Sequence, residues 1–333
     1  MIKRLLTVVI SIILLFCITG CSFIGLLQDE SKPDNDPTIS SSTPLESTGG
    51  TTTLPTDTST DPTDTQTPTT EPTQGETTPP QPIKQPEPGD DDFVKVVRYI
   101  PDIIIDLRYS TENNFTSQQI YDFSDAWLRY GTVKKLMLVQ EELRQYGYRL
   151  KIWDGFRPPA AQFKLWEVCP DPTYVSNPNN GFSSHSRGNT VDVTLVYEDG
   201  TELSMPTGFD DFSKLADRDY SDCGAEAAAN ALLLERIMEK HGFKPYYGEW
   251  WHFTDTQSYA VEQTFEPVAA AVYYADCNEF ISLRTQPSTS AQVITKIPAG
   301  EEFRVVAIYA DFALVEYRNA FGYVLRDYIK PVN

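Results

Sequence analysis

The sequence is poor in histidine, with only His185, His241 and His252 among its 333 residues. Histidine is the commonest protein ligand for transition metals and the side chain that most easily exchanges protons near neutral pH. A chain with three histidines therefore has few places where such chemistry can occur.

Cysteine is also scarce, with five in the whole chain. Cys17 and Cys21 lie near the N-terminus, which leaves Cys169, Cys223 and Cys277 in the rest of the sequence. An odd number of cysteines cannot all pair within one chain. An oxidising compartment would allow a bridge between Cys169 and Cys223, but spacing alone does not fix the pairing.

Long hydrophobic runs are absent except for Leu5–Phe16, which follows Lys3 and Arg4. This pattern is typical of a secretory signal, and the run is too short for an ordinary membrane-spanning helix. Its end, Ile18–Cys21, resembles the processing site of bacterial lipoproteins. The resemblance implies a signal peptide over residues 1–20, a lipid on Cys21 and a location on the extracellular face of the bacterial cell membrane. An ordinary cleaved signal with an incidental cysteine is the alternative.

Positive charge is in short supply, since 27 Lys and Arg face 47 Asp and Glu, a net charge of −20. Residues 29–92 alone hold 14 acidic and 2 basic side chains. Such an excess repels phosphate backbones, so we expect no nucleic-acid partner. The same stretch is rich in Thr, Pro and Ser and has almost no large apolar side chains. We therefore expect residues 21–92 to be a lipidated cysteine followed by a disordered linker.

Residues 93–265 mix helical and strand patterns, which predicts an α+β domain. Apolar residues recur at helical spacing in residues 133–146, and residues 222–240 predict a second helix capped by Ser221 or Asp222. Alternating or β-branched runs predict strands over residues 149–153, 190–197 and 246–253.

Residues 271–333 have a different sequence pattern, in which short β-rich segments are separated by turn residues. This pattern predicts a small all-β barrel. The segments Leu283–Ser288 and Gly322–Ile329 resemble a bacterial SH3-like domain. The resemblance implies binding to the peptides of peptidoglycan, and a purely structural appendage is the alternative.

His185 and Asp192 lie seven residues apart, and His252 follows later in the chain. On one continuous strand, residues separated by an odd number face opposite sides, so convergence of the first two needs a turn or bulge, which Gly188 could supply. Two imidazoles and one carboxylate leave a fourth position open, the arrangement of a catalytic zinc ion. His241 sits at the end of a predicted helix, where a structural role is favoured.

Glu249 precedes His252 by three residues, so one short segment offers a proton acceptor beside a metal ligand. The alternative is an aromatic core strand with one surface acid. Arg157 follows the predicted strand through a tight turn, where its guanidinium could stabilise an oxyanion. The alternative for Arg157 is a surface ion pair with Asp154.

These segments, together with Asn113–Thr116 and Met205–Asp210, resemble the D-alanyl-D-alanine dipeptidases of the vancomycin-resistance type, a branch of the zinc D,D-peptidases. The likeness runs from Tyr99 to Asp255. It implies an α+β zinc D,D-peptidase domain with one Zn²⁺, Glu249 as general base and Arg157 as transition-state stabiliser. The implied zinc ligands are His185, Asp192 and His252, and the implied contacts to the substrate's ammonium group are Asp210 with Ser183 or Ser184.

Two residues depart from the family pattern: Phe156 stands where tyrosine is common, and Thr190 where alanine is common. The expected substrate is D-Ala-D-Ala or a wall stem peptide, and a need for a free amino group would separate a dipeptidase from a D,D-carboxypeptidase. Two further alternatives are a cysteine wall hydrolase using Cys169 or Cys223 and a non-catalytic wall-binding lipoprotein.

Overall fold

A computed structural model describes residues 83–332 of the chain. The expected signal peptide, the lipidated Cys21 and most of the expected linker lie outside these residues. Among residues 83–332, no helix is both long enough and apolar enough to cross a membrane.

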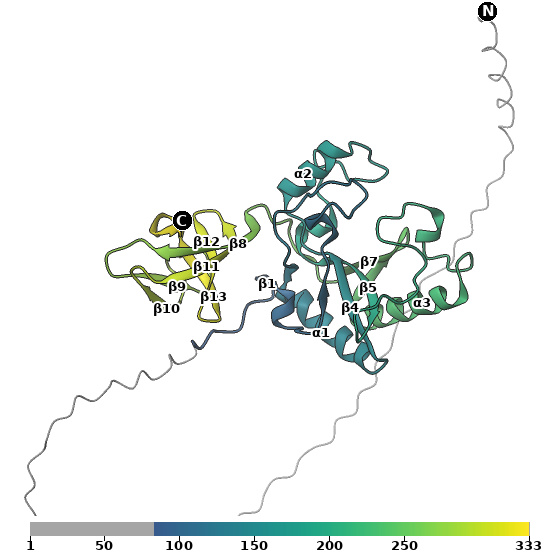
Figure 1. Cartoon of the computed structure of the whole chain (residues 1–333), viewed down its shortest axis with the longest axis horizontal. Helices are drawn as coiled ribbons and strands as arrows, with labels where there is room; N and C mark the ends of the chain where they lie inside the picture. Colours follow the sequence, from purple (N-terminus) through teal and green to yellow (C-terminus); the bar gives the residue numbers. More distant parts are fainter. Residues whose placement is uncertain (1–82, 333) are drawn as a thin grey trace, which may run out of the picture. The chain divides into compact units, whose positions relative to one another are not determined.

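A five-stranded sheet organises the first part of the described chain (Figure 1). The strand order is β2-β4-β5-β7-β6, with β2 parallel to β4 and every other neighbouring pair antiparallel. The bounds are β2 Ile104–Ile105, β4 Tyr148–Asp154, β5 Thr190–Tyr197, β6 Phe243–Tyr246 and β7 Glu249–Asp255. The mixed helices and strands confirm the predicted mixed α and β character of this region.

Three helices accompany the sheet: α1 (Tyr130–Arg144), α2 (Pro159–Val168) and α3 (Ala225–Lys240). In α1 the buried residues Val133, Leu136 and Leu143 recur at helical spacing, so they form one apolar stripe. α1 packs on β4, α3 packs on β5, β6 and β7, and the two helices contact each other. They therefore cover one face of the sheet.

The central strand β5 is buried along nearly its whole length. Side chains alternate along a strand, so Val191, Val193 and Leu195 point to one face while Thr190, Asp192 and Thr194 point to the other. The three apolar residues are fully buried in the main hydrophobic core. The polar set, which contains Asp192, lies on the opposite face of the sheet.

Several short elements complete this part of the chain. Strands β1 (Phe93–Lys95) and β3 (Trp127–Arg129) form a two-stranded antiparallel sheet. Short 3₁₀ helices are η1 (Val96–Arg98), η2 (Arg108–Ser110), η3 (Ser184–Arg187) and η4 (Lys214–Ala216).

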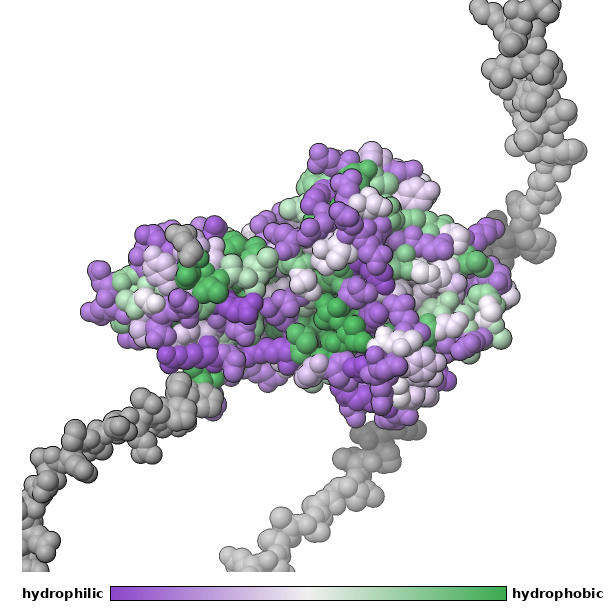
Figure 2. Space-filling view, viewed as in Figure 1, coloured by the Kyte–Doolittle hydropathy of each residue, from purple (hydrophilic) through white to green (hydrophobic). Residues whose placement is uncertain are grey.

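The C-terminal part is built from β-strands, which confirms the predicted all-β, SH3-like region. Its seven strands form one sheet in the order β10-β9-β13-β12-β11-β8-β14. In chain order the elements are β8 (Phe265–Ala275), β9 (Phe280–Arg284), β10 (Val293–Pro298), β11 (Glu302–Tyr309), β12 (Phe312–Tyr317), β13 (Ala320–Leu325), the 3₁₀ helix η5 (Arg326–Tyr328) and β14 (Ile329–Pro331). A second core forms around the buried side chains of Ile281, Leu283 and Val315. Hydrophilic residues cover most of the face seen in Figure 2, which agrees with apolar residues being gathered into these two cores.

The predicted strand over residues 246–253 is confirmed over residues 249–253 but is not continuous. The structure instead has a hairpin, with β6 ending at Tyr246 and β7 beginning at Glu249. The aromatic run hides the turn, because Tyr247 and Gly248 form it within a β-favouring sequence. The turn matters for function, since it places Glu249 at the first position of β7.

Two boundaries also differ from those expected. Helix α3 begins at Ala225 with Gly224 as its N-cap and no side-chain cap, so Ser221 and Asp222 do not cap it. Ordered chain begins before Phe93, because Glu87 accepts a hydrogen bond from the Tyr130 hydroxyl at 2.8 Å. The acidic end of the expected linker is thus held by a partner on α1.

Candidate active site

His185 reaches the site from η3, which lies between α2 and β5. The Ser183 side chain accepts a hydrogen bond from the His185 amide at 3.4 Å, which caps this short turn. Gly188 then has φ +75° and turns the chain into β5 at Thr190. The seven-residue spacing is bridged by a 3₁₀ turn ending in a left-handed glycine, so the expected need for a turn at Gly188 is met.

Gly188 is required for its small size as well as its backbone conformation. A Cβ at this position would lie 2.4 Å from Cε1 and 2.7 Å from Cζ of Phe93. Phe93 is itself fixed, because its ring stacks on Phe265 with centroids 4.4 Å apart. Any side chain at residue 188 would therefore disturb both the core and the turn that carries His185.

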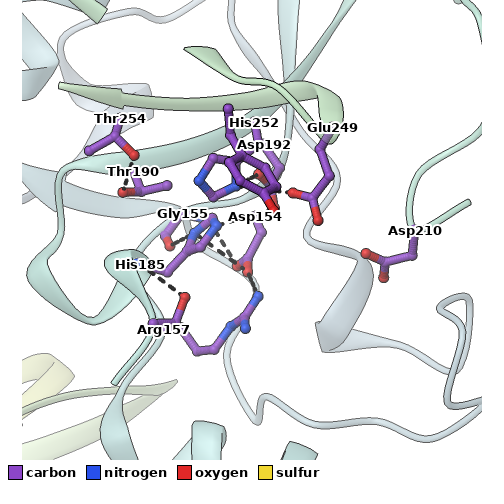
Figure 3. A network of polar contacts seen from close by, with 12 residues as sticks. Asp154, Gly155, Arg157, His185, Thr190, Asp192, Asp210, Glu249, His252 and Thr254 are labelled. Atoms are coloured by element: carbon purple, nitrogen blue, oxygen red, sulfur yellow. Dashed lines mark hydrogen bonds and ion pairs between the residues drawn. The ribbon is translucent and has the colours of Figure 1, made fainter. Parts of the chain in front are cut away.

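Asp192 and His252 face each other across the β5–β7 pair, in which they are direct register partners. The His252 Nδ1 lies 2.9 Å from Asp192 Oδ1, and the His185 Nε2 lies 3.3 Å from Asp192 Oδ2. One ligand atom from each of the three residues lies within 4.8 Å of the others. Figure 3 shows the two imidazoles and the carboxylate turned toward a common point.

The state of these atoms fits a bound metal ion. The His185 Nδ1 lies 2.8 Å from the Gly155 carbonyl, which makes Nδ1–H the donor and leaves the Nε2 lone pair facing Asp192. Asp192 Oδ1 is buried and has no hydrogen-bond partner, although the His252 Nδ1 lies 2.9 Å from it. A buried carboxylate oxygen without a partner is costly, and a cation at this point would satisfy it. Imidazole and carboxylate donors suit divalent transition metals.

The carboxylate of Glu249 lies beside the cluster, with Oε2 3.4 Å from the His252 Nδ1. Burial raises the pKa of Glu249 and the charge of Asp192 adds to this, while His252 opposes it. A carboxylate with a raised pKa binds a proton more readily at neutral pH. This property suits a residue that accepts a proton from water and later donates it.

Arg157 is buried, with 9% of its surface exposed, so the alternative of a surface arginine is wrong. The ion pair with Asp154 is nevertheless present, with Nη2 2.7 Å from Oδ2. Arg157 also donates to Gln162 Oε1 at 3.1 Å and to the Tyr121 hydroxyl at 3.3 Å. The completely buried Asp154 in turn accepts from the Tyr121 hydroxyl at 2.8 Å and from the Gly155 amide at 2.9 Å. The guanidinium is therefore locked in one orientation.

Asp210 has a left-handed backbone, with φ +56°, and accepts a hydrogen bond from the Tyr109 hydroxyl at 2.9 Å. Burial and the negative charge of Asp192 raise the pKa of Asp210 to about 8, against the opposing effects of Tyr109 and Arg157. In Figure 3 its carboxylate lies to one side of the three proposed ligands.

The three proposed ligands, Glu249, Arg157 and Asp210 line one cavity of about 420 Å³. Ser183 and Ser184 line the same cavity, so the structure brings together every residue that the sequence assigned to metal, catalysis or substrate. The assigned residues in its wall are Arg157, Ser183, Ser184, His185, Asp192, Asp210, Glu249 and His252.

His241 lies elsewhere, at the C-cap of α3, and its Nε2 is 2.7 Å from a carboxylate oxygen of Glu142 on α1. The expected structural role fits this contact, although the partner is a side chain rather than a helix carbonyl. Cys169, Cys223 and Cys277 are free, and Cys223 donates to the Tyr220 carbonyl at 3.4 Å. No bridge forms between Cys169 and Cys223. Since His185 and His252 face Asp192 and His241 faces Glu142, no histidine is left to activate either thiol.

The sequence did not single out Tyr109, Tyr121 and Gln162. Tyr121 and Gln162 hold Arg157, and Tyr109 holds Asp210. They come from η2, from the loop before β3 and from α2, so no local spacing links them to the motifs. The only available signal was the position of Gln162 on the helix that begins just after Arg157.

The two departures from the family pattern lie outside the cluster of proposed ligands. Phe156 is buried against Phe93, with ring centroids 4.4 Å apart. The Thr190 hydroxyl lies 3.1 Å from that of Thr254 across the β5–β7 pair (Figure 3). Both residues support the framework of the site and leave its polar groups unchanged.

Comparison with known proteins gives two domain matches. Residues 90–271 match the D-Ala-D-Ala dipeptidase family of M15 peptidases, and residues 279–330 match a bacterial SH3 domain family. The chain is 36% identical over 162 residues to a D-alanyl-D-alanine dipeptidase of Escherichia coli K12, covering 49% of this chain and 83% of that protein. It is 33% identical over 168 residues to one from Enterococcus faecalis, covering 44% and 83%, and 33% identical over 187 residues to one from Streptomyces coelicolor, covering 49% and 91%.

Replacing Gly188 tests the turn that carries His185. Gly188→Ala should lower the free energy of unfolding by about 1–3 kcal/mol more than Gly147→Ala, because only the former overpacks a core. Gly147 is a matched control, since its φ of +74° is nearly the same and nothing lies within 4 Å of its missing Cβ. Urea unfolding of both variants measures the difference. Equal losses would show that the contact with Phe93 carries no cost.

Replacing Asp210 tests the cost of its partly buried charge. The pKa of Asp210 is about 8 in the folded chain and near 4 in the unfolded chain. Its ionisation therefore lowers the free energy of unfolding progressively between pH 4 and pH 8, and the whole loss is present above pH 8. In chelator-treated protein, Asp210→Asn should be more stable than the parent at pH 9 by about 1–3 kcal/mol, with the gain disappearing toward pH 4. Asparagine tolerates the left-handed backbone equally well. A variant less stable than the parent at pH 9 would contradict the raised pKa.

Proposed function

The chain belongs to the D-Ala-D-Ala dipeptidase family of M15 peptidases, and we propose on this premise that it is a zinc-dependent peptidase that hydrolyses D-alanyl-D-alanine. One observation carries the proposal. Three proposed ligands, a proton acceptor and a locked guanidinium, which come from β5, β7, η3 and the turn after β4, line a single cavity. The buried Oδ1 of Asp192, which has no hydrogen-bond partner, supports a cation at this point.

We assign zinc to His185, Asp192 and His252, because two imidazoles and one carboxylate are the donor set of catalytic zinc in many peptidases. When bound, the ion would supply Lewis acidity toward a carbonyl oxygen and would lower the pKa of a water molecule. Since these three residues are the only metal-capable group of three found in the described chain, one ion per catalytic domain is proposed.

The protein's own residues would perform the proton transfers. Glu249 takes a proton from the attacking water and delivers it to the leaving amine, for which its raised pKa is suited. Arg157 donates hydrogen bonds to the carbonyl oxygen as negative charge develops there, and Asp154 keeps the guanidinium in place for this role. The arginine needs no reorganisation at the moment of reaction, because its other contacts are already made.

Asp210 would bind the free ammonium group of the dipeptide, with Ser183 or Ser184 nearby. An ammonium beside the partly buried carboxylate would stabilise its ionised form and offset the cost of its charge. A substrate with a blocked amine would leave that charge unpaired, so the site would favour a dipeptide over the end of a longer stem peptide.

We further propose that the enzyme acts at the outer face of the bacterial membrane, anchored by a lipid on Cys21. The apolar N-terminal run and the processing-site pattern at Ile18–Cys21 support this location. The SH3-like region would then bind peptidoglycan near the substrate. The remaining alternative of a non-catalytic wall-binding lipoprotein is disfavoured by the complete set of polar groups in the cavity.

Release of D-alanine from D-Ala-D-Ala by the purified chain tests the function. Glu249→Gln should lower kcat by about 10²–10⁴-fold, because the substitution removes the proton acceptor but keeps its shape. Glu239→Gln, at an exposed position on α3, is the control and should leave kcat unchanged.

The same assay with N-acetyl-D-Ala-D-Ala separates two activities. The dipeptidase predicts hydrolysis of the free dipeptide and little of the acetylated one. Preferential cleavage of the acetylated substrate would instead identify a D,D-carboxypeptidase. No hydrolysis of either by zinc-loaded protein would refute the proposed function.

Metal analysis after dialysis tests the ligands without an activity assay. The parent chain should retain one zinc ion per molecule, while His185→Ala and His252→Ala should lose stoichiometric binding because each removes a donor. His241→Ala is the matched control and should bind as the parent does, since His241 pairs with Glu142. Zinc retained by His185→Ala, or lost by His241→Ala, would contradict the assignment.

A further inference from the structure

The hairpin that carries Glu249 and His252 is irregular. Pro245 pairs with Phe253, but the next pair along is Tyr246 with Glu249. Residues 250–252 of β7 therefore have no opposite residues on β6. Pro245 also lacks an N–H, so it cannot donate to its partner Phe253. Backbone carbonyls that lose their strand partner need another donor.

Arg218 donates to carbonyls in and beside this stretch, including that of His252. Its Nε donates to the Tyr246 carbonyl at 2.8 Å, and its Nη2 donates to the carbonyls of Glu249 and His252, both at 3.1 Å. The Arg218 backbone amide adds a bond to the Tyr247 carbonyl at 3.0 Å. One residue from the loop after η4 thus serves four carbonyls of the hairpin.

The rest of the guanidinium is held by Glu235 on α3 and by Tyr220, which precedes that helix. Its Nη1 donates to Glu235 at 2.8 Å and to the Tyr220 hydroxyl at 3.1 Å, while the Tyr220 hydroxyl donates to Glu235 at 2.8 Å. The cation lies over the Phe253 ring, 4.5 Å from its centroid, and only 6% of the Arg218 side chain is exposed. All five N–H groups of a guanidinium are accounted for. Lysine, with three donors on a point charge, cannot reproduce this pattern.

We propose that Arg218 is a positioning residue that fixes the spacing between Glu249 and His252. Arg218 does not line the cavity, and it contacts Glu249 and His252 through their backbone carbonyls. The distances that it would maintain are those from His252 Nδ1 to Glu249 Oε2, 3.4 Å, and to Asp192 Oδ1, 2.9 Å. The proposal rests on the proposed function for its catalytic consequence, but its effect on metal binding is independent of the substrate.

The test compares Arg218→Gln and Arg218→Lys in the full chain with the parent. The zinc dissociation constant, measured by competition with a chelator, should rise about 10–100-fold in Arg218→Gln, as for other residues that support metal ligands indirectly. The kcat for D-Ala-D-Ala per folded molecule should fall by a similar factor, with KM changing less than about threefold, because contacts to the substrate are intact. Arg218→Lys should recover only part of the loss.

Arg149→Gln is the matched control. Arg149 also donates to two backbone carbonyls, those of Asp102 and Glu198, but neither belongs to the site. This variant should lose stability without a change in kcat or in zinc affinity. Glu235→Gln provides a milder variant if Arg218→Gln does not fold, and it should shift both quantities in the same direction.

The proposal would be overturned if Arg218→Gln and Glu235→Gln both kept their zinc affinity and their kcat per folded molecule within about twofold of the parent. Equal losses in Arg149→Gln would overturn it too, since they would reflect general destabilisation. If the parent binds zinc but leaves D-Ala-D-Ala intact, the proposed substrate fails while the zinc comparison still decides the role of Arg218.

Discussion

The register between β5 and β7 is the constraint on which the site depends, because it sets Asp192 directly across from His252. Side chains alternate along a strand, so a slip of one residue would turn one of the two toward the helices. The apolar residues Val191 and Val193 on either side of Asp192 prevent such a slip, since they would have to leave the core. The same packing that stabilises the sheet therefore fixes two of the three proposed ligands, and η3 adds His185 to a pair already in place.

The cavity places three carboxylates under different influences. Asp192 has two imidazoles beside it, which outweigh burial and hold its pKa below the ordinary value. Glu249 and Asp210 are more affected by burial and by the charge of Asp192, and their pKa values are raised. One remains an anion suited to a cation, while the others bind protons more readily. The different surroundings of these carboxylates thus give them different pKa values, which suit them to different roles.

Local patterns predicted much of this arrangement from the sequence. The strand over residues 190–197 has the bounds of β5, because its β-branched residues are buried on both faces. The turn before β7 was missed, since aromatic residues flank it without interruption. The role of Arg218 could not be predicted, because its partners are backbone carbonyls beside an irregular pairing of β6 with β7, and no side-chain pattern marks that irregularity.

The scarcity of histidine has a thermodynamic consequence. A ligand stabilises a fold only to the extent that it binds the folded state and not the unfolded chain. Here the proposed donors come from η3, β5 and β7, and they meet only when the sheet has formed. An unfolded chain with three histidines offers little competition for the ion. Zinc present at 100 times its dissociation constant would therefore add about 2.7 kcal/mol to the stability of the fold, and metal supply would govern the lifetime of the protein as well as its activity.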